Sequence, residues 1–333
     1  MTENFYLLRP EQLPREHREL SGNEVACLEP LATQYRRAPE AQTLSATRKA
    51  ITRLGLRPED FQAVGEDPEE SQGNRDNDRA FLIVRVQGEV MPLLVHSTLQ
   101  GFATLLDEAL VNGTDLEPQA WGQLRAAYNT LFDTFLGRPP ARDEEVPMPP
   151  PRSTSEGERD ALRRWTRGHY VFMSIVQGLS VVLNGLTRDI NASDIPSAQV
   201  NFERATTIMM GAESALRFTG DYSYNAYEKS VRPTLMPPIA PPGMTGLRWR
   251  DHEHLVKILS GMRPLFSALD PALEPYREAF YASISHTYDS HKLVCSSFVG
   301  TERTSLLMAE RTEKSAIEIL DHFKRVRLQL VKS

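Results

Sequence analysis

Two residues near the C-terminal end have types and a spacing that could do chemistry. His291 and Cys295 stand four residues apart in the segment HKLVC. On a helix, residues i and i+4 lie on one face about a turn apart. An imidazole there can bind a haem iron axially, and the cysteine can reach the porphyrin edge to form one thioether. The same pair also fits a thiolate–imidazolium nucleophile, or simple packing of both side chains.

A second axial histidine is available upstream in the segment WRDHEHL, which contains His252 and His254. The sequence from there to His291 fits a helix, a turn at 267–271 and a return helix. Two antiparallel helices would place histidines on facing sides of a gap that suits a planar cofactor. His252 and His254 point about 200° apart around a helix, so only one can face inward. From the residues alone, the choice between them stays open.

Zinc is the alternative metal for these histidines. His252, His254 and His291 would supply three nitrogen ligands, with Asp251 or Glu253 as a carboxylate ligand. The chain lacks an HExxH pattern, so zinc ranks below haem. His286 is interpreted as structural or as a neighbour of a haem propionate. The remaining histidines show no constellation in the sequence: His17, His96, His169 and His322.

Composition excludes several classes of protein. The 333 residues contain only two cysteines, Cys27 and Cys295, which excludes a disulfide scaffold and a cysteine-rich zinc or iron–sulfur site. Cys27 is expected to be an inert thiol. A formal net charge of -6 gives no general attraction for phosphate backbones. We therefore expect no nucleic-acid partner.

Hydropathy and the N-terminal sequence bear on localisation. By our count, no run reaches the roughly 18 apolar residues that a membrane span needs. Residues 1–20 are polar and charged, without the basic start and apolar run of a secretory signal. We therefore predict a cytoplasmic protein with no membrane partner.

The elements that position these residues are predicted to be mainly helical. Apolar residues recur with a helical period over 41–56, 97–113, 116–137, 158–186, 198–218, 249–262, 271–298 and 302–330. Non-helical segments are also predicted: an exposed acidic loop (64–79), a short hairpin or buried segment (80–95), a Pro-rich loop (138–157) and an irregular Pro/Gly-rich segment (234–246). The chain is thus divided into a mixed, partly irregular N-terminal region, 1–96, and an all-helical domain, 97–333.

The spacing of His252, His291 and Cys295 resembles that of the histidine-ligated haem-dependent aromatic oxygenases of the tryptophan 2,3-dioxygenase superfamily. Among these it is most similar to the hydroxylases that act on 3-methyl-L-tyrosine in saframycin-type antibiotic biosynthesis. The stretch RFTGDYSYNAYEKSVRPTLMPP (217–238) also resembles segments of the haem enzyme of pyrrolnitrin biosynthesis, from the same superfamily. The resemblance lies in the C-terminal half. It implies a helical bundle that encloses a haem, and a homo-oligomer.

The resemblance also implies the cofactor and its ligands. It implies a c-type haem with a single thioether to Cys295, and an iron bound by His291 and His252. This favours His252 over His254. The usual attachment motif C-x-x-C-H is absent, so the thioether would have to form inside the cell.

The implied reaction is hydroxylation of the phenol ring of 3-methyl-L-tyrosine, or tyrosine, next to its hydroxyl group. The oxidant would be hydrogen peroxide, or dioxygen with a reductant such as ascorbate. His291 shares a helical turn with the tethered Cys295, so we expect His252 to leave the iron and act as acid–base. Candidate partners for an aromatic amino acid are Arg217, Tyr222, Tyr224, Arg232, Arg248, Trp249 and Arg250.

Three other functions remain compatible with the residues. One is a haem dioxygenase that acts on an indole, although Cys295 argues against it. Another is a non-enzymatic haem sensor with two histidine ligands. The third is a helical interaction protein without a cofactor. Product formation from 3-methyltyrosine separates the enzyme from the sensor, and a colourless purified protein would favour the third.

Overall fold

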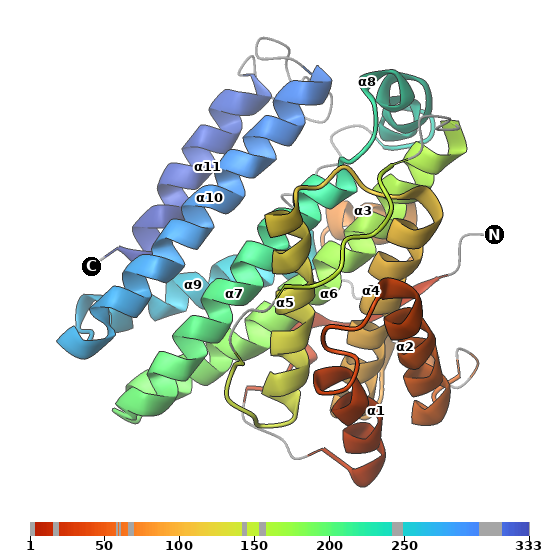
Figure 1. Ribbon diagram of the computed structural model, residues 1–333. Helices are drawn as coiled ribbons and strands as arrows, with labels where there is room; N and C mark the ends of the chain where they lie inside the picture. The colour runs from red at the N-terminus through yellow and green to blue at the C-terminus, as the bar shows by residue number, and fades with distance from the viewer. Residues whose placement is uncertain are drawn as a thin grey trace.

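Helices build almost all of the structure (Figure 1). The computed structural model describes residues 4–15, 20–57, 59, 61–65, 70–141, 145–152, 158–241, 249–299 and 315–332. Its α-helices are α1 (Gly22–Ala32), α2 (Glu40–Leu54), α3 (Gln72–Ala80), α4 (Val90–Asn112), α5 (Pro118–Phe135), α6 (Glu158–Asn191), α7 (Ile195–Thr219), α8 (Tyr224–Ala226), α9 (Arg250–Ser267), α10 (Glu274–Val299) and α11 (Ala316–Val331). Shorter turns are η1 (Pro10–Gln12), η3 (Tyr227–Val231), η4 (Arg232–Leu235) and η6 (Pro271–Leu273). The prediction of a mainly helical fold is confirmed.

A three-stranded sheet joins distant parts of the N-terminal region. The strands are β1 (Phe5–Leu8), β2 (Gln62–Ala63) and β3 (Ile83–Gln87), in the order β1-β3-β2. β3 pairs parallel to β1, with Phe5 opposite Ile83, and antiparallel to β2. Of the two alternatives predicted for 80–95, the hairpin is therefore wrong, whereas the buried segment is confirmed for most of its apolar residues. β3 pairs with distant segments, and α4 begins directly after it.

The helical period predicted most long helices to within a few residues. The end of α2 is set by Gly55, whose φ of 76° is left-handed and suits glycine. The turn predicted at 267–271 separates α9 from α10, as expected. Part of the predicted 302–330 helix lies outside the described residues, and α11 forms the remainder.

Part of the acidic segment 64–79 is helical, which corrects the prediction of an exposed loop. Ser71 begins α3 by accepting a hydrogen bond from the backbone N–H of Asn74. Asn74 and Asn77 are buried, and Asp78 accepts a hydrogen bond from Trp249, which is 171 residues away in the sequence. The polar composition of 64–79 predicted an exposed loop, because the residues that bury α3 come from other parts of the chain.

The central helix α6 corrects the hydropathy argument. Residues 160–191 are long and apolar enough to cross a membrane by length and composition, and 72% of the apolar window is buried inside the protein. α6 packs against α4, α7 and α9 (Figure 1). This burial identifies a core helix. Counting consecutive apolar residues missed it because polar residues interrupt the run.

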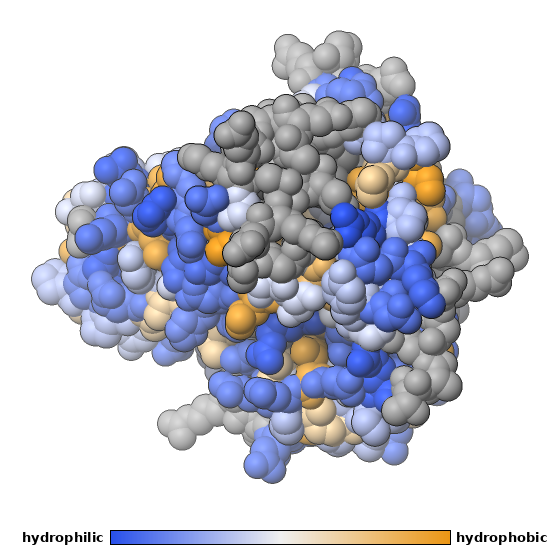
Figure 2. Space-filling view, turned by 90° about the horizontal axis from the view of Figure 1, so that it is seen from above, coloured by the Kyte–Doolittle hydropathy of each residue, from blue (hydrophilic) through white to orange (hydrophobic). Residues whose placement is uncertain are grey.

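One large hydrophobic core joins both ends of the chain. It includes Leu8 and Cys27 near the N-terminus and Phe280 and Val331 near the C-terminus. Cys27 is buried, and burial raises the pKa of its thiol, as expected for an inert cysteine. Figure 2, viewed from above, shows mainly polar side chains with small apolar patches between them. The proposed division at residues 96 and 97 falls within α4 and stays a prediction.

His96, in α4, makes stability depend on pH. It is 5% exposed, its ring meets that of Phe61 edge-on, and burial lowers its pKa from 6.5 to about 4. Between pH 6.5 and 4 the unfolded chain therefore binds more protons at this site, and stability falls as pH falls. We expect His96→Leu to remove roughly 2 kcal/mol of the stability loss between pH 7 and 5.

Urea unfolding of the apoprotein at both pH values measures this difference. Its control is His286→Leu, at an exposed position of α10. An equal acid-induced loss in wild type and His96→Leu would show that His96 ionises normally in the folded protein.

Candidate functional site

One face of α10 carries both residues singled out by the sequence. Val294 and Cys295 stand three and four residues after His291, and Phe298 stands seven residues after it, so all four share a side of the helix. This side packs on the end of α7, where a Cβ on Gly220 would lie 2.8 Å from Val294 Cγ1. The close approach seats His291 and Cys295 against the protein interior.

The His291 imidazole is shielded from water and available as a ligand. Burial lowers its pKa to about 4, so the ring is neutral at pH 7. The side chain nevertheless keeps some accessible surface. Among the described residues, none forms a hydrogen bond to this ring, and a desolvated nitrogen without a partner is costly. A ligand that takes the lone pair would remove that cost.

Cys295 is a protonated thiol in an apolar setting. Burial raises its pKa to about 11, which opposes the thiolate–imidazolium nucleophile considered from the sequence. The neighbouring Tyr227, in η3, has a pKa raised to about 12, chiefly by burial and partly by the charge on Cys295. Phe298 stacks on Tyr222 and Tyr227, with ring centroids 5.1 and 4.6 Å apart. An aromatic cluster thus includes Phe298, which lies three residues after the thiol.

His169, in α6, belongs to the site although the sequence reading gave it no role. Its Nδ1 lies 2.7 Å from the backbone oxygen of Trp165. Burial is the main cause that lowers the pKa of His169 to about 4, and the charge of His291 contributes to the lowering. The aromatic residues around His169 in the segment WTRGHY were the available signal, but a single sequence does not show that α6 meets α9.

The first turn of α9 brings His252 to the same region. Trp249 precedes the helix, and its ring centroid lies 4.8 Å from that of Phe81 and 5.7 Å from that of His169. His252 follows one turn later and is partly accessible. α9 packs on α6 and α11, whereas α10 packs on α7 and α11. α9, the turn and α10 form the predicted helix–turn–helix. However, α9 packs mainly on α6 and α10 packs mainly on α7.

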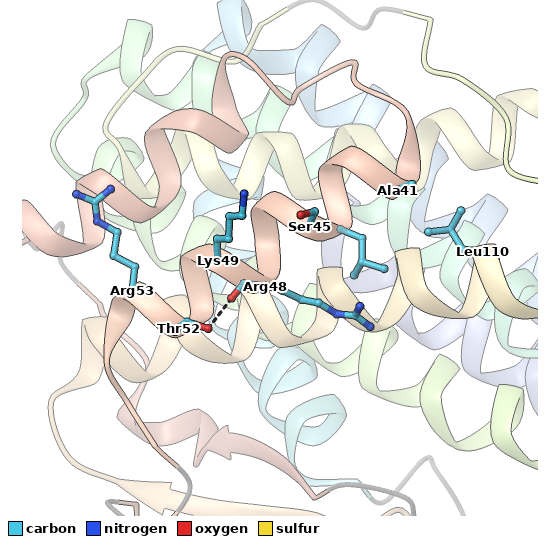
Figure 3. A pocket seen from close by; sticks show the side chains of 8 residues that line it. Ala41, Ser45, Arg48, Lys49, Thr52, Arg53 and Leu110 are labelled. Atoms are coloured by element: carbon cyan, nitrogen blue, oxygen red, sulfur yellow. Dashed lines mark hydrogen bonds between the residues drawn. The ribbon is translucent and has the colours of Figure 1, made fainter.

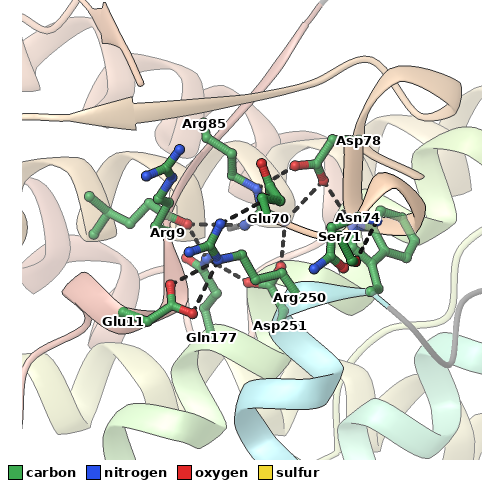
Figure 4. Close-up of polar contacts among 12 residues, drawn as sticks. Arg9, Glu11, Glu70, Ser71, Asn74, Asp78, Arg85, Gln177, Arg250 and Asp251 are labelled. Atoms are coloured by element: carbon green, nitrogen blue, oxygen red, sulfur yellow. Dashed lines mark hydrogen bonds and ion pairs between the residues drawn. The ribbon is translucent and has the colours of Figure 1, made fainter. Parts of the chain in front are cut away.

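A buried polar network fixes the start of α9 (Figure 4). Arg85 of β3 donates to Asp251 at 2.5 Å and to both carboxylate oxygens of Asp78 at 2.8 and 2.9 Å. Asp78 also accepts from Trp249 Nε1 at 2.9 Å, and Asp251 accepts from Gln177 Nε2 at 2.8 Å. Burial opposes the charge on Arg85, but the two carboxylates raise its pKa overall. Asp78 and Arg85 of the N-terminal region therefore hold Trp249 and Asp251. Asp251 directly precedes His252 in the sequence.

The proposed substrate residues occupy different settings. Tyr222 is buried against Phe298, whereas Tyr224 is 51% exposed. Arg232 pairs with Glu228 at 2.6 Å.

The other members of that set lie nearer the ends of helices. Arg250 pairs with Glu11 and Glu70, each at 3.0 Å. Arg217 is half-buried in the last turn of α7, and Arg248 lies outside the described residues. Among the candidate substrate residues, Trp249 packs against the ring of His169.

The zinc alternative finds no support in the described part of the chain. There, no group of three or more His, Cys, Asp or Glu residues is arranged to hold a metal ion. The pKa of His254 is lowered mainly by burial, and Glu11 of η1 is among the charges that act on it. A haem supplies four nitrogens itself and needs at most two protein ligands.

A groove of about 680 Å³ lies elsewhere, along α2 (Figure 3). Arg48, Lys49 and Arg53 give it a basic lining, and Arg48 pairs with Asp107 at 2.8 Å. None of the residues that the sequence singled out lines this groove.

Comparison with known proteins assigns the chain to a family. Residues 6–276 match the family described as SfmD 3-methyl-L-tyrosine peroxygenase. The chain is 39% identical to the 3-methyl-L-tyrosine peroxygenase of Streptomyces lavendulae over 330 residues, which cover 97% of this chain and 89% of the relative. It is also similar to a crystal structure of reduced SfmD obtained by soaking with sodium hydrosulfite, with a TM-score of 0.75 and 37% identity over 87% of this chain and 96% of that one. The chain belongs to the 3-methyl-L-tyrosine peroxygenase family.

Proposed function

We propose that this chain is a haem-dependent peroxygenase that hydroxylates the ring of 3-methyl-L-tyrosine next to the phenol hydroxyl. The observation that carries the proposal is the face of α10 on which His291 and Cys295 lie, within a chain 39% identical to a peroxygenase of that substrate. This relationship favours the hydroxylase over an indole dioxygenase, a haem sensor and an interaction protein without cofactor.

The residues present fit a covalently held haem. His291 offers a neutral, desolvated imidazole, which is the form that binds iron. Cys295, one turn away, offers a partly buried thiol, which suits a single thioether at the porphyrin edge. We propose His252 as the second ligand, because it begins a helix fixed by the Arg85 network. The crystal structure of SfmD reduced with sodium hydrosulfite fits a redox-active centre in that protein.

The haem would supply the oxidising chemistry, in which peroxide gives one oxygen atom to the substrate and leaves as water. A ring C–H bond becomes C–OH, so one phenol and one hydrogen peroxide give one catechol and one water. The protein's own part is to bind and orient the ring and to exclude water. Tyr222, Tyr227 and Phe298 provide an aromatic surface beside Cys295 for this purpose.

We propose that His252 would bind the resting iron and, in the substrate complex, would instead serve as an acid–base group. His252→Ala should convert the resting iron from two histidine ligands to one. The optical and electron paramagnetic resonance spectra of the purified variant measure this change. His254→Ala, two residues away, is the matched control and should retain the wild-type spectrum. A two-histidine spectrum in His252→Ala would show that another residue is the second ligand.

The reaction is tested by incubating the purified protein with 3-methyl-L-tyrosine and hydrogen peroxide. The expected product is heavier by one oxygen atom, and labelled peroxide should supply that atom. Parallel reactions with dioxygen plus ascorbate, and with L-tyrosine, determine the oxidant and the preferred substrate. If the haem-loaded protein forms no catechol from either amino acid with either oxidant, the proposed function is wrong.

The localisation, oligomeric state and partners of the enzyme are also proposals. We propose that it works in the cytoplasm as a homo-oligomer, without nucleic-acid or membrane partners. The acidic charge of the chain supports the absence of a nucleic-acid partner. Sedimentation analysis of the haem-loaded protein measures the oligomeric state.

A further inference from the structure

Gly220 directly follows α7, at the point where this helix meets the face of α10 that carries His291 and Cys295. A Cβ on Gly220 would lie 2.8 Å from Cγ1 of Val294 and 3.2 Å from Cε2 of Phe298. Non-bonded carbon atoms pack best about 3.5–4.0 Å apart. The φ of Gly220 is −95°, which residues with side chains also adopt. The position therefore requires glycine for space and not for its conformational freedom.

The side chains that a Cβ would meet cannot easily turn aside. Val294 is β-branched, and such a side chain has one strongly preferred rotamer in a helix. The Phe298 ring stacks on the rings of Tyr222 and Tyr227, with centroids 5.1 and 4.6 Å away. A larger residue at position 220 should therefore push α10 away from the end of α7. Restoring normal carbon contacts would take a shift of roughly 0.7 Å or more.

A shift at Val294 acts on both residues of the proposed haem site. Val294 directly precedes Cys295 and stands three residues after His291. Backbone hydrogen bonds tie each turn of a helix to the next, so the three residues move together. His291 and Cys295 would have to reach two fixed points of one rigid porphyrin. Groups of this kind need to be held within about 0.5 Å of their working positions, which is less than the expected shift.

We propose that Gly220 is a positioning residue, which sets the approach of α10 to α7 and so aligns Cys295 with the porphyrin edge while His291 binds the iron. This inference rests on the proposed function, because it takes haem as the group that both residues hold. Adding the thiol S–H across a vinyl C=C forms one C–S and one C–H bond, so the step needs no oxidant. A misplacement of about 1 Å can slow a reaction roughly 100-fold.

The test measures the share of haem that acid–acetone does not extract from proteins purified with haem. In Gly220→Ala this share should fall to less than about half of the wild-type value. Gly220→Ala/Val294→Ala removes the atom that the new Cβ would meet, and should recover most of the loss. The control is Gly211→Ala in α7, whose Cβ would lie 2.2 Å from Cβ of Ala127 in α5. It should lower stability but leave the covalent share unchanged.

A second variant tests the same contact from the other helix. Val294→Ile lengthens the side chain that meets Gly220, and it should also lower the covalent share if Gly220→Ala does not fold. An undiminished share in whichever of these variants folds overturns the inference alone, as does a double variant that recovers nothing. A wild-type protein whose haem extracts completely refutes instead the thioether of the proposed function.

Discussion

Arg85→Met should lower the free energy of unfolding by about 3–5 kcal/mol, because it leaves buried carboxylates without their counter-charge. Asp251 is 1% exposed, and its Oδ2 lies 2.5 Å from Arg85 Nη2. Asp78, with a side chain 13% exposed, also loses both of its contacts with the guanidinium. Denaturant unfolding of the purified protein measures this loss.

Two variants make the Arg85 experiment specific. Arg48→Met breaks an ion pair with Asp107 in which the arginine side chain is 61% exposed, and it should cost no more than about 1 kcal/mol. The double variant Arg85→Met/Asp251→Asn should lose less than the sum of its single variants, because one buried charge is removed with its partner. Equal losses in Arg85→Met and Arg48→Met would contradict a structural role for the buried network.

The Arg85 network also predicts an effect at the proposed haem. Asp251 directly precedes His252, and Trp249 is held by Asp78 over 2.9 Å. A weakened start of α9 should therefore loosen the His252 ligand before the protein unfolds. The fraction of resting iron with two histidine ligands, measured optically in Arg85→Met below its unfolding temperature, should fall relative to Arg48→Met.

His291→Ala should have the largest effect on activity. Loss of an outer-shell partner of a metal ligand already costs roughly 10–100-fold in affinity or activity, so loss of the ligand itself should cost at least about 100-fold. We expect haem content and peroxide-dependent hydroxylation both to fall to background. The haem absorbance per protein and the rate of catechol formation measure the two effects.

The control for His291→Ala is His286→Ala, an exposed histidine on the same helix. It should retain the haem content and rate of wild type. If His291→Ala instead loaded haem and hydroxylated 3-methyl-L-tyrosine normally, the assignment of His291 would be wrong. Unfolding measurements on both variants would separate a ligand effect from loss of the fold, since α10 packs along α7 and α11.

The sequence predicted the long helices because an apolar face repeats with the period of the helix. It singled out His291 and Cys295 for a related reason, since their spacing is local to one helix. α3 and its Asp78 were missed, because polar residues of that helix are buried and Asp78 binds Trp249, a partner distant in the sequence.

His169 shows the same limit within the site. Its neighbour Gly168 closely approaches Thr219 at the end of α7, and the sequence contains the glycine but not the helix end that it meets. The apolar character of α6 was underestimated because it is spread over a window rather than a run. The sequence thus indicated residues whose chemistry is local, and the structure was needed where distant segments meet.

The covalent attachment of haem through Cys295 tests the central claim most directly. The measurement is the pyridine haemochrome spectrum of wild type and Cys295→Ser, before and after acid–acetone extraction. We predict that wild type retains its haem, with a band between those of b-type and two-thioether c-type haem, and that Cys295→Ser releases its haem. Haem that extracts freely from wild type would contradict the thioether, and a wild-type protein without haem would contradict the account as a whole.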